Sequence, residues 1–257
     1  MRLLISVVSA DEAREAIAGG ADILDVKNPA EGSLGAHFPR VIQEVRAITP
    51  RWLAVSAAIG DMPNLPGTAA LAALGAATCG ADYVKVGLWG PKSQAEAVVL
   101  LQEVQRAVSA FPGVMVIAAG YADAQRAGGT QPDTGWLLPP TLLPRIAQAA
   151  GVAGCMLDTA IKDGRRLFDF LSPETLQALA AEAHAAGLLF ALAGALQEQD
   201  LPLIRDLGAD VAGVRSAACR GGRRAGPLDT ERVRRLREVI ALPLRPAAQR
   251  DGSQGRE

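Results

Sequence analysis

The chain has 257 residues, of which 49% are hydrophobic, and its formal net charge is −1. A chain of this length and composition can bury a large core, either as one α/β domain or as two smaller ones. The charge excludes a broad basic field for nucleic acid or an anionic membrane, and no apolar run reaches the ~18 residues that span a bilayer. We therefore expect a cytoplasmic protein with no nucleic-acid or membrane partner.

The first apolar run, RLLISVVS at 2–9, is expected to be a strand. It does not resemble a secretion signal, because acidic residues follow it at once and no small-residue cleavage site closes it. Variants of one phrase then recur along the chain, and in each a glycine ends a helix and a short apolar run follows as a strand. The four copies are GGADILDVK at 19–27, CGADYVKVG at 79–87, GVAGCMLDT at 151–159 and LGADVAGVR at 207–215.

Three more apolar runs complete a set of eight candidate strands: WLAVSAAIG at 52–60, VMVIAAG at 114–120 and LLFALAG at 188–194. Each strand precedes a stretch rich in Ala, Leu and Glu that is suited to a helix, such as 92–110, 173–186 and 229–240. Eight alternations of strand and helix predict a single (β/α)8 TIM barrel over residues 1–244. We expect the polar segment 245–257 to be a tail that is disordered at its end, and the loop at 121–138 to lie over the barrel mouth.

Cysteines and arginines add no further site. Cys79, Cys155 and Cys219 are far apart, with no C-x-x-C pair and no histidine cluster, so we expect neither a zinc site nor a disulfide framework. The arginines at positions 232–237 fall on a predicted helix and are expected to be solvated. Helices rich in Ala often pack against copies of themselves, which favours a homo-oligomer.

Charged side chains stand where the predicted strands end. Strands of a parallel barrel are buried on both faces, so a charge within them needs a reason. Side chains two apart share a face, so Asp25 and Lys27 project together while Leu24 and Val26 face the helices. A buried ion pair or a solvated charge would explain any one such residue, but their shared position in three non-adjacent strands predicts one pocket. The candidate catalytic residues are Asp25, Lys27, Lys85, Asp158 and Lys162.

A cluster of lysines has a chemical logic. A free ammonium with a pKa near 10.4 holds less than about a thousandth of its population as nucleophilic amine at neutral pH. Neighbouring cations and desolvation lower that pKa, and nearby carboxylates can move protons. The cluster therefore predicts Schiff-base chemistry on a carbonyl substrate, and the pattern leaves open which lysine forms the adduct.

The loops after the seventh and eighth predicted strands, at 191–197 and 213–222, suit a phosphate group. In many barrels these loops hold phosphate with backbone and side-chain donors. Glycines there allow close approach of the backbone, although turn geometry alone would also explain them. The candidate phosphate-binding residues are Gly194, Gly213, Arg215 and Ser216, with added charge from Arg220.

Four motifs together resemble a known family. They are DVKNPAEGSLGA at 25–36, YVKVGLWG at 83–90, MLDTAIKDGRRLFDF at 156–170 and VAGVRSAAC at 211–219. The chain is similar, over about residues 1–240, to the (5-formylfuran-3-yl)methyl phosphate synthases of methanofuran-type cofactor biosynthesis, also called 4-(hydroxymethyl)-2-furancarboxaldehyde-phosphate synthases.

The resemblance implies a lyase that joins two molecules of a triose phosphate, glyceraldehyde 3-phosphate, with loss of phosphate and water, and that needs no metal or redox cofactor. It also implies that Lys27 is the Schiff-base lysine and Lys85 a proton acceptor, with Asp25, Asp158 and Lys162 completing the site. Two alternatives stay open. One is a class I aldolase acting on another phosphorylated sugar, and the other is a barrel that binds a phosphate ligand without turnover.

Overall fold

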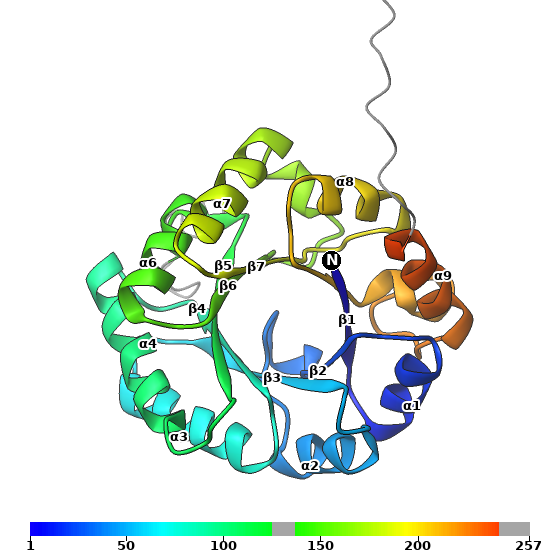
Figure 1. Cartoon of the computed structure of the whole chain (residues 1–257), viewed down its shortest axis with the longest axis horizontal. Helices are drawn as coiled ribbons and strands as arrows, with labels where there is room; N and C mark the ends of the chain where they lie inside the picture. Colours follow the sequence, from blue (N-terminus) through cyan, green and yellow to red (C-terminus); the bar gives the residue numbers. More distant parts are fainter. Residues whose placement is uncertain (125–136, 242–257) are drawn as a thin grey trace, which may run out of the picture.

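The computed structural model describes residues 1–124 and 137–241 and shows eight parallel strands closed into a barrel (Figure 1). Each strand pairs with the next in the chain, and the last pairs with the first. The predicted (β/α)8 barrel is therefore confirmed. The strands are β1 (Arg2–Val7), β2 (Ile23–Val26), β3 (Ala54–Met62), β4 (Tyr83–Leu88), β5 (Met115–Tyr121), β6 (Gly154–Asp158), β7 (Leu189–Leu192) and β8 (Val211–Val214).

Helices form the outer ring (Figure 1). Several begin as the sequence predicts, because the hydroxyls of Ser9, Ser93 and Ser172 accept the backbone N–H three residues on and so cap a helix start. The α-helices are α1 (Ala10–Ala18), α2 (Pro39–Ile48), α3 (Pro66–Thr78), α4 (Gln94–Val108), α6 (Leu143–Ala150), α7 (Pro173–Ala185), α8 (Leu201–Asp206) and α9 (Thr230–Ala241).

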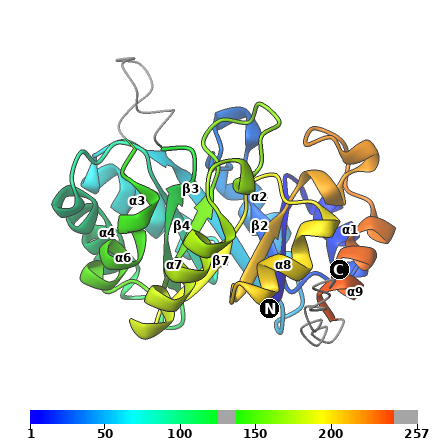
Figure 2. The same ribbon diagram turned by 90° about the horizontal axis from the view of Figure 1, so that it is seen from above.

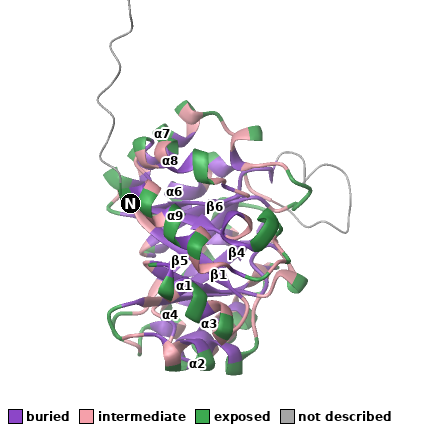
Figure 3. Ribbon diagram, turned by 90° about the vertical axis from the view of Figure 1, so that its right-hand side faces the viewer, coloured by how far each residue is buried: buried purple, intermediate pink, exposed green. Residues whose placement is uncertain are grey.

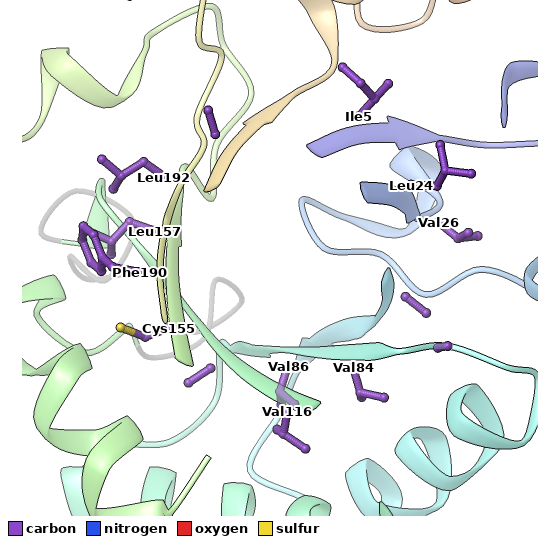
Figure 4. Close-up of a cluster of buried hydrophobic side chains, with 14 of the residues drawn as sticks. Ile5, Leu24, Val26, Val84, Val86, Val116, Cys155, Leu157, Phe190 and Leu192 are labelled. Atoms are coloured by element: carbon purple, nitrogen blue, oxygen red, sulfur yellow. The ribbon is translucent and has the colours of Figure 1, made fainter. Parts of the chain in front are cut away.

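Buried side chains form two layers on either side of the strands. The outer layer packs between strands and helices, and Figure 4 shows its members pointing away from the barrel interior. It includes the residues predicted to face the helices, which are Leu24, Val26, Val84, Val86 and Leu157. The inner layer fills the barrel with side chains such as Leu4, Ile23 and Met156. Exposed residues lie mainly on the outer helices and loops (Figure 3), so the polar groups inside the barrel are shielded from bulk water.

Lys85 does not end its strand, contrary to the prediction. β4 continues to Leu88, because its later residues still pair with β3 and β5. Lys85 is in register with Ile117 of β5, whereas Asp158 is in register with Tyr121, four residues nearer the carboxyl end of that strand. Lys85 therefore lies deeper in the barrel than the strand-end residues.

Loops from several strands rise at one end of the barrel. Figure 2 shows the loop after β2 and the loop after β6 side by side at that end, and Ser33 Oγ donates to the carbonyl oxygen of Thr159 at 2.7 Å between them. The carboxyl ends of the strands therefore carry a joined set of loops above the barrel interior, which is where barrel enzymes hold their substrates.

Some sequence predictions fall outside what the structure tests. The tail at 245–257 and most of the predicted mouth loop lie outside the described residues. The homo-oligomer also stays a prediction. Within residues 1–124 and 137–241, no helix combines the length and the apolar character needed to cross a bilayer.

Candidate active site

Four ionisable side chains enter the barrel from β2, β4 and β6. Alternate strands of such a barrel contribute to the same interior layers, so these residues can meet although they are distant in the chain. Asp25 is 0% exposed, Lys85 and Asp158 are each 2% exposed, and Lys27, directly after β2, is 5% exposed. Charges this deeply buried require partners, and the structure supplies them as two ion pairs.

The deeper pair joins Lys85 and Asp25. Lys85 Nζ lies 2.7 Å from Asp25 Oδ1, and Ser6 Oγ donates to Asp25 Oδ2 at 3.1 Å. Although the two charged atoms are close, neither makes a hydrogen bond of acceptable geometry among the described residues. The pair is thus held by charge, and the amine of Lys85 is not committed to a directional hydrogen bond.

Above it, Asp158 forms ion pairs with two lysines. Lys162 Nζ donates to Asp158 Oδ1 at 2.7 Å, and Lys27 Nζ lies 3.7 Å from Asp158 Oδ2. The backbone N–H of Thr159 also donates to Oδ1, at 2.8 Å. Burial by itself would raise the pKa of Asp158, but Lys162 and Lys27 hold that pKa well below its usual range. Asp158 is therefore an anion shared by two lysines.

The amine of Lys27 has a lowered pKa. Burial lowers its pKa from 10.5 to about 8; Asp158 and Asp25 oppose the shift, and the nearby cations Lys85 and Lys162 add to it. At pH 7 about a tenth of such a group is neutral amine, far more than for a solvated lysine. Among the lysines, this side chain is therefore suited to nucleophilic attack on a carbonyl.

A cavity of about 170 Å³ opens above these charges. Asp25 and Lys85 lie beneath it and do not line it, but the other predicted site residues do. These are Lys27, Asp158, Lys162, Gly194, Gly213, Arg215 and Ser216. The structure therefore brings together seven residues from widely separated parts of the chain, and the Lys85–Asp25 pair lies deeper in the barrel.

Two of the predicted glycines keep the cavity open. A Cβ on Gly213 would lie 3.0 Å from Met156 Cε and 3.1 Å from Ala193 Cβ. Gly194 has a φ of 108°, which side-chain-bearing residues rarely adopt, and a Cβ there would lie 3.1 Å from Thr159 Cγ2. The backbone at both positions can therefore approach a ligand closely, and phosphate binding there stays a prediction.

Arg215 has a different role from the one predicted. Its guanidinium pairs with both carboxylate oxygens of Glu12 and donates to the carbonyl oxygens of Ser6, Arg224 and Gly226. These contacts occupy all five of its N–H donors. Arg215 thus joins β8 to α1 and shapes the cavity wall, and it has no donor left for a phosphate.

Arg220 is also misplaced by the sequence prediction. Its side chain is 67% exposed, with Nε 3.4 Å from Asp229 Oδ2, and it does not line the cavity. Arg224 lines the cavity instead, and its Nη2 donates to the carbonyl oxygen of Gly32 at 3.4 Å. Four arginines crowd positions 215–224, and sequence spacing cannot tell which of them turns inward.

Sequence reasoning also missed Ser6. This serine lines the cavity and its hydroxyl donates to Asp25. A signal was available, because Ser6 is a polar residue within an apolar strand and is in register with Asp25 on β2. Alternation along β1 would have placed it on the interior face.

Comparisons with known proteins give one consistent family. A family model described as 4-HFC-P synthase matches residues 3–237. Proteins named (5-formylfuran-3-yl)methyl phosphate synthase from Methanocaldococcus jannaschii, Methanopyrus kandleri and Methanothermobacter thermautotrophicus are 52%, 50% and 49% identical to this chain. Each alignment covers 93% of this chain and 99% of the relative.

Solved structures of lower identity share the fold. The 3-hexulose-6-phosphate synthase of Salmonella typhimurium has a TM-score of 0.60 at 19% identity, over 93% of this chain and 98% of that one. A phosphoribosyl anthranilate isomerase from Thermus thermophilus has a TM-score of 0.57 at 18% identity, over 94% of this chain and 98% of its own. At such identities the likeness supports the barrel alone.

Replacing the buried cation at position 27 should stabilise the fold at neutral pH. The pKa of Lys27 is about 8 in the folded protein and 10.5 when solvated, so the unfolded chain binds the proton more tightly. We expect Lys27→Met to raise the free energy of unfolding in urea at pH 7, by at most about 3 kcal/mol. The gain should shrink as the pH rises from 8 to 10.5, where the native lysine becomes neutral. A variant that is less stable than the parent at pH 7 would contradict this account.

Proposed function

The chain belongs to the 4-HFC-P synthase family, as the four motifs indicate, and on this premise we propose that it makes a phosphorylated furan aldehyde from two molecules of glyceraldehyde 3-phosphate through a Schiff base on Lys27. The observation that carries the proposal is the buried Lys27 amine, whose pKa is about 8, at the wall of a cavity. That amine has both the reactivity and the access that imine formation requires.

The charges of the cavity suit a phosphorylated substrate. Lys27, Lys162 and Arg224 line it against one carboxylate, Asp158. The other two arginines of its lining, Arg215 and Arg165, are paired with Glu12 and Asp163. The excess of positive charge attracts a phosphate monoester, and the backbone near Gly194, Gly213 and Ser216 can approach it closely. A triose phosphate therefore fits better than a neutral carbonyl compound.

The proposed sequence begins with one triose phosphate converted to its ketone isomer and held as an imine on Lys27. The second triose phosphate loses the proton on its central carbon and then its phosphate, which leaves a three-carbon enolate whose terminal carbon adds to the imine carbon. Ring closure, dehydration and release of Lys27 then give the furan. The balance of atoms requires the release of one phosphate and two molecules of water for each furan formed.

The neighbouring groups can move the protons that these steps need. Asp158 is ionised and lies 3.7 Å from the Lys27 nitrogen, so it can accept a proton as the imine forms. Lys162, hydrogen-bonded to the same carboxylate, can return one. Lys85, whose nitrogen lies 2.7 Å from Asp25 in the deeper pair, is the proton acceptor that the family resemblance implies.

Phosphate release tests the reaction against its two alternatives. We expect the purified protein, given glyceraldehyde 3-phosphate, to release inorganic phosphate together with a new furan absorbance. A class I aldolase acting on another sugar would give neither signal with this substrate, and a binding barrel would give no turnover. Phosphate release without furan absorbance would contradict the proposal.

Borohydride trapping tests the role of Lys27. With triose phosphate and borohydride, the imine should be reduced to a stable mass adduct on the peptide that contains Lys27. Lys27→Arg should abolish both adduct and turnover, because a guanidinium is not deprotonated near neutral pH and cannot add to a carbonyl. Lys85→Arg should slow turnover while still permitting adduct. An adduct mapped to Lys85 or Lys162, with Lys27→Arg trapping normally, would reject the assignment.

The pH dependence of trapping follows from the same amine. Only the neutral form of Lys27 attacks a carbonyl, and its pKa is about 8. The initial rate of adduct formation should rise about tenfold per pH unit below 7 and level off above about 8.5. A rate that continues to rise to pH 10 would show that the attacking amine is not perturbed.

A further inference from the structure

A second cavity adjoins the first at the mouth of the barrel. It has a volume of about 490 Å³ and shares three lining residues with the first cavity, Lys162, Arg215 and Arg224. Its far side is formed by Gly32 and Ser33 in the loop after β2. The two cavities are thus separate spaces with a common basic wall, one of them next to Lys27.

Arg224 stands in that common wall with its donors largely unused. Among the described residues its guanidinium donates only to the carbonyl oxygen of Gly32, at 3.4 Å, and forms no ion pair with a carboxylate. Arg215, in the same wall, has all five donors occupied. A half-buried guanidinium with free N–H groups is the geometry that binds phosphate in a bidentate manner.

The second cavity favours an anion. Among the described residues no carboxylate lines it, whereas Lys162 and Arg224 do. Asp61 and Asp158 oppose the fall that burial causes in the pKa of Arg224, and a guanidinium remains protonated at any physiological pH. The positive charge at this wall is therefore permanent.

The loop that forms the far side is fixed in place. Asp61, on β3, accepts the backbone N–H of Ser33 at 2.8 Å and that of Leu34 at 3.2 Å. Gly32 has a φ of 133°, and a Cβ on it would lie 2.1 Å from Asp61 Oδ2. The cavity is therefore a formed space with a rigid wall, which lowers the cost of ordering a ligand there.

We propose that this second cavity holds the second phosphorylated substrate and that Arg224 binds its phosphate. The proposal rests on the two-substrate reaction proposed above. Two triose phosphates must be bound together for a carbon–carbon bond to form between them, and a cavity of about 170 Å³ beside Lys27 leaves the neighbouring space for the second molecule.

Lys162 lies where the two substrates would meet. It lines both cavities and donates to Asp158. In the addition step, the electron pair of the enolate left by phosphate loss forms the new bond to the imine carbon on Lys27 while the carbon–nitrogen π pair moves onto nitrogen. That nitrogen takes a proton from Lys162, which leaves an amine adduct on Lys27. The common wall would thus supply the acid of the carbon–carbon bond-forming step.

Binding of glycerol 3-phosphate tests the second cavity without any turnover. This compound has the phosphate of a triose phosphate and no carbonyl, so it cannot react with Lys27. By titration calorimetry we expect two molecules bound per chain of the parent protein. Arg224→Gln should weaken one of the two sites by about tenfold or more and should weaken the other, which keeps Lys27 and Lys162 in its wall, by much less. Arg223→Gln is the matched control, since this exposed neighbour lines neither cavity and should preserve both sites.

A second variant tests whether the ligand occupies the second cavity, without changing the charge of Arg224. Ala225 lines the second cavity and not the first, so Ala225→Trp should fill it and remove the same site that Arg224→Gln weakens. In Ala225→Trp, borohydride should still trap triose phosphate on Lys27 at the parent yield. In both variants, the KM for furan formation should rise by about tenfold or more.

Several results would overturn the proposal. A single bound molecule in the parent protein, or two sites untouched by both variants, would show that the second cavity does not take a phosphate. Loss of both sites in Arg224→Gln would assign the arginine to the first cavity. Because these readouts are binding measurements, they remain decisive even if the protein makes no furan, and that failure would count against the reaction alone.

Discussion

The site depends on how one carboxylate is divided between two amines. Asp158 is closer to Lys162, at 2.7 Å, than to Lys27, at 3.7 Å. The unequal contact leaves Lys27 with less stabilisation of its positive charge than a tight ion pair would give, and burial then dominates its pKa. A carboxylate placed symmetrically would favour a charged, unreactive lysine. The deeper Lys85–Asp25 pair also affects the pKa of Lys27. The positive charge of Lys85 lowers that pKa, because it disfavours a second cation nearby.

The two arginines in the wall that the cavities share differ in how many of their N–H donors are already hydrogen-bonded, and this difference separates a structural role from a binding role. Arg215 is saturated by Glu12 and three carbonyl oxygens, and it fixes the wall between β8 and α1. Arg224, nine residues on, makes one long hydrogen bond and remains able to bind a ligand. Asp61 also has a structural role. Its carboxylate accepts hydrogen bonds from two backbone N–H groups of the loop after β2 and from the Tyr121 hydroxyl. The contacts of Arg215 and Asp61 thus fix the walls of the cavities, and Arg224 faces those cavities with unused donors.

Local sequence pattern was sufficient for the barrel and for the lysine cluster, because alternation along a strand and the glycine that ends a helix are set within a few residues. It was insufficient where the answer depends on distant partners. The depth of Lys85 follows from the pairing of β4 with β3 and β5. Whether Arg215 or Arg224 has donors to spare depends on Glu12, in α1. Ser6 is different, because alternation along β1 is enough to predict its position beside Asp25.

The contact between Arg215 and Glu12 joins groups 203 residues apart in the chain. It therefore spans the seam where the last strand closes on the first, and it cannot form in a chain that has been synthesised only as far as β7. At that stage Lys27 and Asp158 are already present, but the wall that Arg215 shapes is not. Order of synthesis thus separates the appearance of the reactive amine from the completion of its enclosure.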